Sequence, residues 1–133
     1  MKQNGVEIYA ISIQNEPDYA HEWTWWTSSE CVKFLAEYAS KIDCKVISPE
    51  TFQYGKQYYN DILYNAAANK EVDVWATHFY GTQRSQMDFP ALESDSRELW
   101  MTEVYVPNSS SDADTWPEAV EVAVNMHNAL VES

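Results

Sequence analysis

The chain lacks a long hydrophobic run and has little positive charge. No stretch of about 18 consecutive apolar residues occurs, so the sequence predicts no membrane span. Its 8 Lys and Arg residues stand against 21 Asp and Glu residues, which gives a formal net charge of −13. Such a protein repels nucleic acid and anionic lipid, and no basic patch offers a site for either. We therefore expect neither as a partner, whereas a neutral or weakly acidic polymer stays allowed.

Cysteine is also scarce, because Cys31 and Cys44 are the only two in the chain. The pattern places Cys31 in the first turns of a helix and Cys44 at the start of the next strand, about 15 Å apart along that helix. A disulfide needs Cα atoms within about 7 Å, so we expect two free, buried thiols. No His or Cys spacing typical of a metal site is present. The sequence predicts neither a metal nor a cofactor.

Strand-like apolar runs alternate along the chain with amphipathic helical segments. Thr27 or Ser28 is expected to cap the first helix, with Glu30 in its first turn. The predicted strands are 8–14, 45–48 (ended by Pro49), 72–80 and 98–105, and the predicted helices are 28 to about 42, 57–69 and one that opens at 116–118. Segment 83–96 is expected to be a loop with at most a short helix. This order indicates an α/β fold with a parallel sheet, in one domain that spans residues 1–133.

Polar and aromatic residues follow every predicted strand. They are Asn15-Glu16-Pro17, Glu50-Thr51-Phe52, His78-Phe79-Tyr80-Gly81 and Glu103-Val104-Tyr105. The carboxyl ends of parallel strands converge on one rim, where barrel enzymes do their chemistry. A single Glu at a strand end is often only a cap or a salt-bridge partner. Two of them, Glu16 and Glu103, suggest glycoside hydrolysis, in which about 5.5 Å between carboxylates serves a retaining mechanism and a wider gap an inverting one.

Six Trp and nine Tyr residues accompany these acids. Flat aromatic faces stack on sugar rings or fill a core, and composition alone leaves both roles open.

Taken together, five motifs closely resemble glycoside hydrolase family 30, in its endo-xylanase branch that acts on glucuronoxylan. Asn-Glu-Pro alone is shared with many barrel hydrolases, including cellulases, but the full set in this order is highly specific. The motifs are Ile11-Ser12-Ile13-Gln14-Asn15-Glu16-Pro17-Asp18-Tyr19, Trp23-Thr24-Trp25-Trp26, Pro49-Glu50-Thr51-Phe52, Thr77-His78-Phe79-Tyr80-Gly81-Thr82-Gln83 and Trp100-Met101-Thr102-Glu103-Val104-Tyr105. The resemblance covers nearly the whole chain, from the family's fourth barrel strand to its seventh helix. It implies a partial (β/α)8 TIM barrel of about four βα units, truncated at both ends.

The resemblance implies a retaining endo-β-1,4-xylanase that hydrolyses xylan by double displacement. Glu16 would be the general acid/base, and Glu103 the nucleophile that forms a covalent glycosyl-enzyme. The acid must hold a proton near neutral pH while the nucleophile stays ionised. The partner would then be the polysaccharide substrate.

The resemblance also implies a set of substrate-binding residues. Asn15 would bind a hydroxyl of the sugar at the cleavage point, and His78 and Tyr80 would line the same subsite and orient Glu103. Of Trp25 and Trp26, one is expected to be a sugar platform and the other to pack beneath the rim. We assign Asn15, Trp25, His78, Tyr80 and Tyr105 to substrate binding, and expect Glu50 to support the catalytic pair through a hydrogen bond.

The resemblance to the xylanase branch implies that selectivity for glucuronate side groups comes from a binding site shared between the loops after the seventh and eighth barrel strands. In this chain, loop 107–114 is one residue shorter than the family pattern and carries Asp112 where a serine would contact the acid. An aspartate there would repel glucuronate, so dependence on the side group stays open.

About four βα units cannot close a barrel, which would leave two sheet edges and the apolar interior open. We therefore expect self-association through the open edges. Three alternatives to a xylanase follow: an inactive half-barrel that at most binds polysaccharide, a related β-glucan hydrolase, and an interaction module without a sugar role. The parent enzyme is expected to be secreted, although Met1–Gly5 lacks the apolar stretch of a signal peptide.

Overall fold

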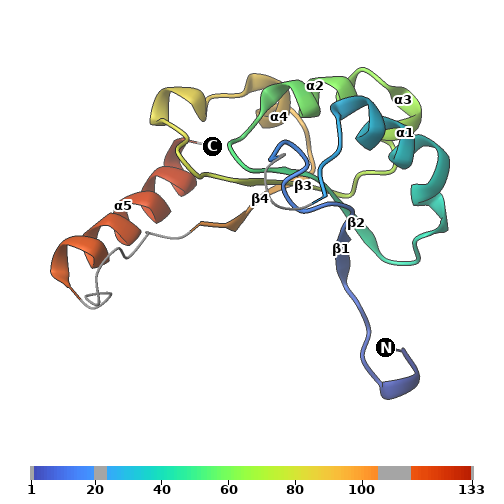
Figure 1. Cartoon of the computed structure of the whole chain (residues 1–133), viewed down its shortest axis with the longest axis horizontal. Coiled ribbons are helices and arrows are strands. Elements are labelled where there is room, and N and C mark those ends of the chain that lie inside the picture. The colour runs from blue at the N-terminus through green and yellow to red at the C-terminus, as the bar shows by residue number, and fades with distance from the viewer. Residues whose placement is uncertain (1, 20–23, 105–114, 133) are drawn as a thin grey trace.

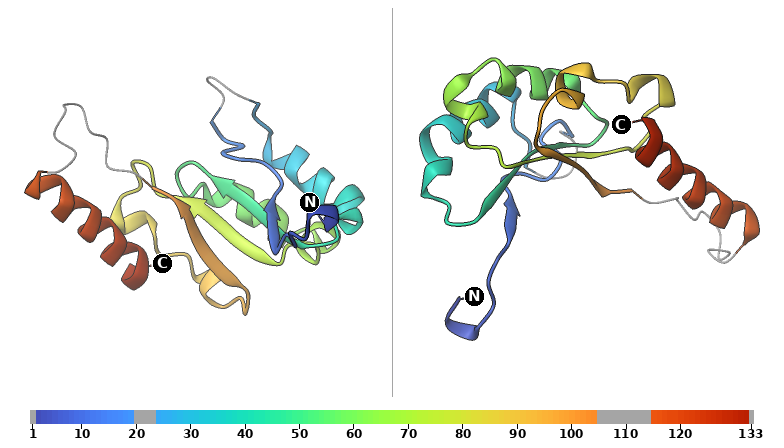
Figure 2. Two further views of the ribbon diagram at one scale, coloured as in Figure 1. Left: turned by 90° about the horizontal axis from the view of Figure 1, so that it is seen from below. Right: turned by 180° about the vertical axis from the view of Figure 1, so that it is seen from behind.

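Four parallel strands form a single curled sheet. The computed structural model describes residues 2–19, 24–104 and 115–132. The strands are β1 (Ala10–Ser12), β2 (Lys45–Thr51), β3 (Val74–His78) and β4 (Glu98–Glu103), and they lie in the order β1-β2-β3-β4. The curl is visible in Figure 2. The predicted α/β fold with a parallel sheet is confirmed, and its arc is that of an open half-barrel.

Both faces of the sheet carry apolar side chains, as expected of buried parallel strands. On the outer face, Val46 and Trp75 join the main core under the helices. On the inner face, Ile47, Val74 and Ala76 form a smaller cluster. Side chains alternate along a strand, so consecutive residues within β2 and within β3 pack on opposite faces of the sheet.

The outer face is covered by short helices (Figure 1). They are α1 (Ser28–Tyr38), which continues as a 3-10 turn (Ala39–Lys41), α2 (Lys56–Leu63), α3 (Ala66–Asn69) and α4 (Pro90–Glu93), with a further 3-10 turn at Arg84–Gln86. Leu35, Tyr59, Ile62 and Trp75 are fully buried between these helices and the sheet. This core holds the strand ends at fixed positions relative to one another.

The start of α1 follows the sequence prediction. The Thr27 hydroxyl accepts the backbone N–H of Glu30 at 3.2 Å, and the Glu30 carboxylate accepts the backbone N–H of Thr27 at 2.7 Å. This reciprocal capping box satisfies two N–H groups that the helix itself leaves unpaired.

Several expected element bounds are wrong, including those of the third and fourth strands, which are Val74–His78 and Glu98–Glu103 rather than 72–80 and 98–105. The first strand is shorter than 8–14, because pairing with β2 stops at Ser12. Pro49 does not end the second strand: β2 continues to Thr51, which pairs with Thr77 after a register shift. The expected helix 57–69 is two helices, because the Asn65 side chain accepts the N–H groups of Ala67 and Ala68 and so begins α3. Asparagine competes for backbone N–H groups in this way at helix starts.

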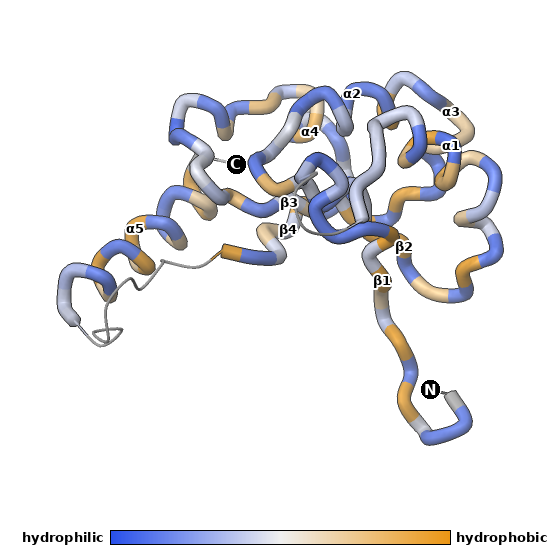
Figure 3. Tube along the Cα trace, in the orientation of Figure 1, coloured by the Kyte–Doolittle hydropathy of each residue, from blue (hydrophilic) through white to orange (hydrophobic). Residues whose placement is uncertain are grey.

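Apolar residues occur along both ends of the chain (Figure 3), and several of them are exposed. Ile8 and Ile11 beside β1 are 44% and 42% exposed, and on α5 (Trp116–Glu132) Val124 and Leu130 are 49% and 83% exposed. Within the described residues the sheet has no strand beyond β1 or β4. No helix in this described part is both long and apolar enough to cross a membrane.

The two thiols are unpaired, as the sequence predicts. Cys31 is fully buried in α1, and burial raises its thiol pKa to about 12. Cys44 is only half-buried, so the expectation of two buried thiols is wrong for this residue. It lies outside the core because it precedes β2 rather than lying within it.

Candidate active site

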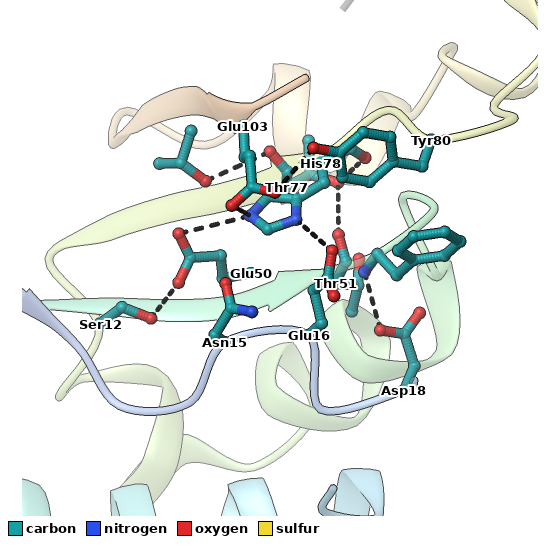
Figure 4. A network of polar contacts seen from close by, with 12 residues as sticks. Ser12, Asn15, Glu16, Asp18, Glu50, Thr51, Thr77, His78, Tyr80 and Glu103 are labelled. Atoms are coloured by element: carbon teal, nitrogen blue, oxygen red, sulfur yellow. Dashed lines mark hydrogen bonds and ion pairs between the residues drawn. The ribbon is translucent and has the colours of Figure 1, made fainter. Parts of the chain in front are cut away.

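Polar side chains from all four strands meet at the carboxyl edge of the sheet (Figure 4). Glu50 lies in β2, His78 ends β3 and Glu103 ends β4, while Glu16 lies on the loop after β1. The backbone N–H of Glu16 donates to the backbone carbonyl of Glu50 at 3.1 Å, which ties the loop to the neighbouring strand. Residues 62 positions apart in the sequence, such as Glu16 and His78, are thereby brought into contact.

Glu16 and Glu103 face each other but differ in exposure. Glu16 is 3% exposed, whereas the Glu103 side chain is 53% exposed. One oxygen of each carboxylate and one ring nitrogen of His78 all lie within 4.8 Å of one another. This arrangement suits a pair of reacting carboxylates with a histidine between them.

His78 is fully buried and bridges the acids. Its Nδ1 lies 2.8 Å from Oε1 of Glu16, while its Nε2 lies 3.6 Å from Oε1 of Glu50 and 4.0 Å from Oε2 of Glu103. Burial by itself lowers the pKa of His78, but the contacts with Glu50 and Glu16 and the charge of Glu103 outweigh it and raise the pKa. The acid nearest to His78 is therefore Glu16. The family resemblance implied that His78 orients Glu103, which lies farther away.

Tyr80 contacts the other acid. Its hydroxyl donates to Oε1 of Glu103 at 2.6 Å. Its ring stacks on Phe52 at 5.1 Å between centroids, and Phe52 in turn packs against Tyr19 at 4.7 Å. The Asp18 carboxylate accepts the backbone N–H of Phe52 at 2.7 Å and holds this aromatic row in place. A strip of three rings therefore lies beside the acids.

Of the remaining residues assigned from the sequence, Asn15 lies beside the acids and the two tryptophans lie apart from them. Asn15 is exposed, and its side chain lies between Glu50 and Glu16 in Figure 4. Trp26 packs on Phe34 of α1 at 5.3 Å, beneath the rim. Trp25 is 50% exposed and lies outside the network of contacts described above. Tyr105 and the loop 107–114 lie outside the described residues.

Sequence reasoning missed the contribution of Ser12. Its hydroxyl donates to Oε2 of Glu50 in a short hydrogen bond. This bond and the contact with His78 lower the pKa of Glu50, although burial acts in the opposite direction as the largest single effect. The available signal was a lone hydroxyl between Ile11 and Ile13 in an otherwise apolar strand.

Comparisons with known proteins agree with this geometry. Over 135 aligned residues, which include 99% of this chain, it is 53% identical to "Glucuronoxylanase XynC" of Bacillus subtilis (strain 168). A crystal structure of a GH30 endoxylanase from Clostridium papyrosolvens matches 98% of the chain with a TM-score of 0.88 and 42% identity. The resemblance to glycoside hydrolase family 30 is thereby confirmed.

A second structure supports the same family. The glycoside hydrolase family 30 subfamily 8 xylanase of Clostridium acetobutylicum matches 99% of the chain with a TM-score of 0.85 and 26% identity. No family model matches the chain. The chain spans 32% of the curated relative and 33% of each of the two structures. What it shares with these proteins is the arc of the barrel that carries Glu16 and Glu103.

Proposed function

We propose that this chain carries the catalytic pair of a retaining endo-β-1,4-xylanase that acts on glucuronoxylan. Glu16 is the general acid/base and Glu103 the nucleophile. The observation that carries the proposal is the approach of their carboxylate oxygens to within 4.8 Å, with His78 beside both. Retaining glycosidases hold their two carboxyl groups about 5–5.5 Å apart, whereas inverting enzymes need about 6.5–9.5 Å to admit a water molecule.

The two environments support this division of roles. Glu16 is almost fully buried and contacts His78, so a proton that it donates goes to the leaving oxygen rather than to bulk water. Glu103 is half-exposed and accepts a hydrogen bond from Tyr80, which orients its carboxylate and leaves it accessible for attack on the anomeric carbon. After attack, Glu16 is a carboxylate and can accept a proton from the water that releases the sugar.

Asn15 and the aromatic row offer contacts for the polymer. The exposed amide of Asn15, next to Glu16, can hydrogen-bond a sugar hydroxyl at the cleavage point. Tyr19, Phe52 and Tyr80 present flat faces on which sugar rings can stack. Xylan lies outside cells, so we expect the enzyme that contains this arc to be exported.

The decisive experiment places this chain in the corresponding segment of Glucuronoxylanase XynC, because the two sequences align over 99% of the chain. We expect the chimera to release reducing ends from glucuronoxylan. Glu16→Gln and Glu103→Gln should each lower kcat on the order of 10³-fold or more. The matched control is Glu98→Gln, the same change at the opposite end of β4. Unchanged turnover in either active-site variant would remove the assignment.

Azide separates the two roles. In a Glu16→Ala chimera, azide can attack the glycosyl-enzyme without base assistance and yields a β-glycosyl azide. In a Glu103→Ala chimera, azide takes the place of the nucleophile and yields the α-anomer. The opposite pattern of anomers would reverse the assignment of acid/base and nucleophile.

The isolated chain tests the alternative of an inactive arc that binds polysaccharide. The exposed apolar residues of β1 and α5 favour this outcome for the chain alone. Incubation with glucuronoxylan and a parallel affinity gel distinguish the cases: Glu103-dependent release of reducing ends indicates an active arc, and retardation without release indicates binding only.

A further inference from the structure

A third acid, Glu50, is buried next to the proposed catalytic pair. It is 9% exposed and has a positive φ of 56°, a backbone conformation that a non-glycine residue adopts at some energetic cost. Ser12 donates to one of its carboxylate oxygens, and the other oxygen lies 3.6 Å from Nε2 of His78. Glu50 is therefore linked to Glu16 through the imidazole of His78.

The acids around His78 restrict where its protons can lie. Glu16 from the loop after β1 faces Nδ1, and Glu50 from β2 and Glu103 from β4 face Nε2. The ring of Tyr80, two residues after His78, packs edge-on against the imidazole with 5.8 Å between ring centroids. An ionised carboxylate only accepts hydrogen bonds, so a lone pair on a nitrogen that faces one is unfavourable. A proton on Nδ1 can be donated to Oε1 of Glu16 at 2.8 Å, and a proton on Nε2 directs positive charge toward Glu50 and Glu103, whose oxygens lie beyond hydrogen-bond distance.

We propose that Glu50, anchored by Ser12, is a positioning residue that holds His78 doubly protonated, with its Nδ1–H donated to Oε1 of Glu16. The proton that Glu16 transfers then lies on Oε2, the carboxyl oxygen that accepts no hydrogen bond from His78. The catalytic part of this inference rests on the proposed function, whereas the protonation of His78 does not.

The arrangement has a defined consequence in each half of the reaction. When Oε2–H of Glu16 protonates the leaving oxygen, Glu16 becomes an anion and its hydrogen bond from the His78 cation becomes an ion pair, hence stronger. When water attacks the glycosyl-enzyme, its proton returns to Oε2. His78 keeps both of its protons throughout, and Glu50 supplies the negative charge that keeps them there.

The protonation can be measured in the 133-residue chain by ¹⁵N NMR of the histidine rings, with His78 assigned through loss of its signal in His78→Asn. We expect the wild-type ring to carry protons on both nitrogens at neutral pH. Glu50→Gln should lower the pH at which the ring loses a proton, and the control Glu98→Gln should leave it unchanged. A neutral wild-type ring at neutral pH, or an unchanged midpoint in Glu50→Gln, would overturn the proposal.

Ser12 supplies a second pair of variants that leaves Glu50 itself in place. Ser12→Ala removes the hydroxyl and should lower the same midpoint by a smaller amount, and Ser12→Thr should restore it. If Ser12→Ala and Ser12→Thr titrate alike, the hydroxyl does not anchor Glu50 and that part of the proposal fails.

The catalytic consequence is tested in the chimera. Glu50→Gln should lower kcat about 10- to 100-fold with little change in KM, as expected for loss of a supporting partner. The alkaline limb of the pH profile should move to lower pH. A fall in kcat with an unmoved pH profile indicates a merely structural role and contradicts the proposal. If the unsubstituted chimera does not cleave xylan, the proposed function fails, and the NMR titration decides the protonation alone.

Discussion

The hydroxyl of Tyr80 donates a 2.6 Å hydrogen bond to Oε1 of Glu103. A donor at this position stabilises the carboxylate when it departs from the covalent glycosyl-enzyme. Hydrogen bonds to charged groups contribute about 1.5–3 kcal/mol. Tyr80 thus assists the second half of a double displacement more than the first.

Tyr80→Phe is therefore expected to slow breakdown of the intermediate. In the chimera, kcat should fall about 10- to 100-fold, and KM should fall with it because the glycosyl-enzyme accumulates. Rapid-quench kinetics with an activated aryl xyloside should show a burst of product. The control is Tyr64→Phe, the same change at a side chain that is 87% exposed. A fall in kcat without a burst would assign Tyr80 to another step.

The Asp95 carboxylate gives a pH-dependent contribution to stability at the opposite end of the sheet. Arg97 donates to it from Nε at 2.9 Å and from Nη2 at 2.6 Å, which lowers the pKa of Asp95 from 3.8 to about 2. A carboxyl whose folded pKa is lowered stabilises the fold above its ordinary pKa, and this contribution is lost as pH falls through the folded value. Asp95→Asn should cost about 1–2 kcal/mol at neutral pH and only a small part of that near pH 2, where half of the folded carboxyl is already protonated.

Urea unfolding of wild type and Asp95→Asn across this range measures the difference. Asp88→Asn, at an exposed site, serves as the control and should show little effect at any pH. A difference that persists undiminished near pH 2 would show that the carboxyl charge is not its source.

The two thiols should react at different rates. Cys31 is fully buried with a pKa raised to about 12, whereas Cys44 is half-buried. Because the thiolate is the reactive form, iodoacetamide at mildly alkaline pH should label Cys44 first, with Cys31 slower on the order of 100-fold or more in the folded state. Peptide mass spectrometry over time, with and without urea, measures both rates. Equal rates in the folded protein would contradict the burial of Cys31.

The exposed edge at β1 should promote self-association. Ile8 and Ile11 are both more than 40% exposed beside a strand with one unpaired side in the described structure. Ile8→Lys and Ile11→Lys place charge on this edge, which proteins use to block strand pairing. Sedimentation velocity should show concentration-dependent oligomers of the wild type that the two variants reduce. Tyr64→Lys, remote from β1, should associate as the wild type does, and a monomeric wild type would refute the prediction.

Local signals account for the parts of the fold that the sequence predicted well. The Thr27–Glu30 capping box and the alternation of strand and helix depend on residues a few positions apart. The break at Asn65 was also local, but the apolar periodicity of 57–69 obscured it. The passage of β2 through Pro49 was not local, because Thr51 continues the strand by pairing with Thr77 of β3.

For the site, the sequence by itself determined which residue types stand at the strand ends and that they share one rim, since strand direction alone requires this. Only the tertiary structure decided which groups touch: His78 binds Glu16 through Nδ1, and Ser12 binds Glu50 across two strands. The physical reason is that strand curl, register shifts and the positive φ values of Glu16 and Glu50 set these distances, and each depends on packing between segments far apart in the chain.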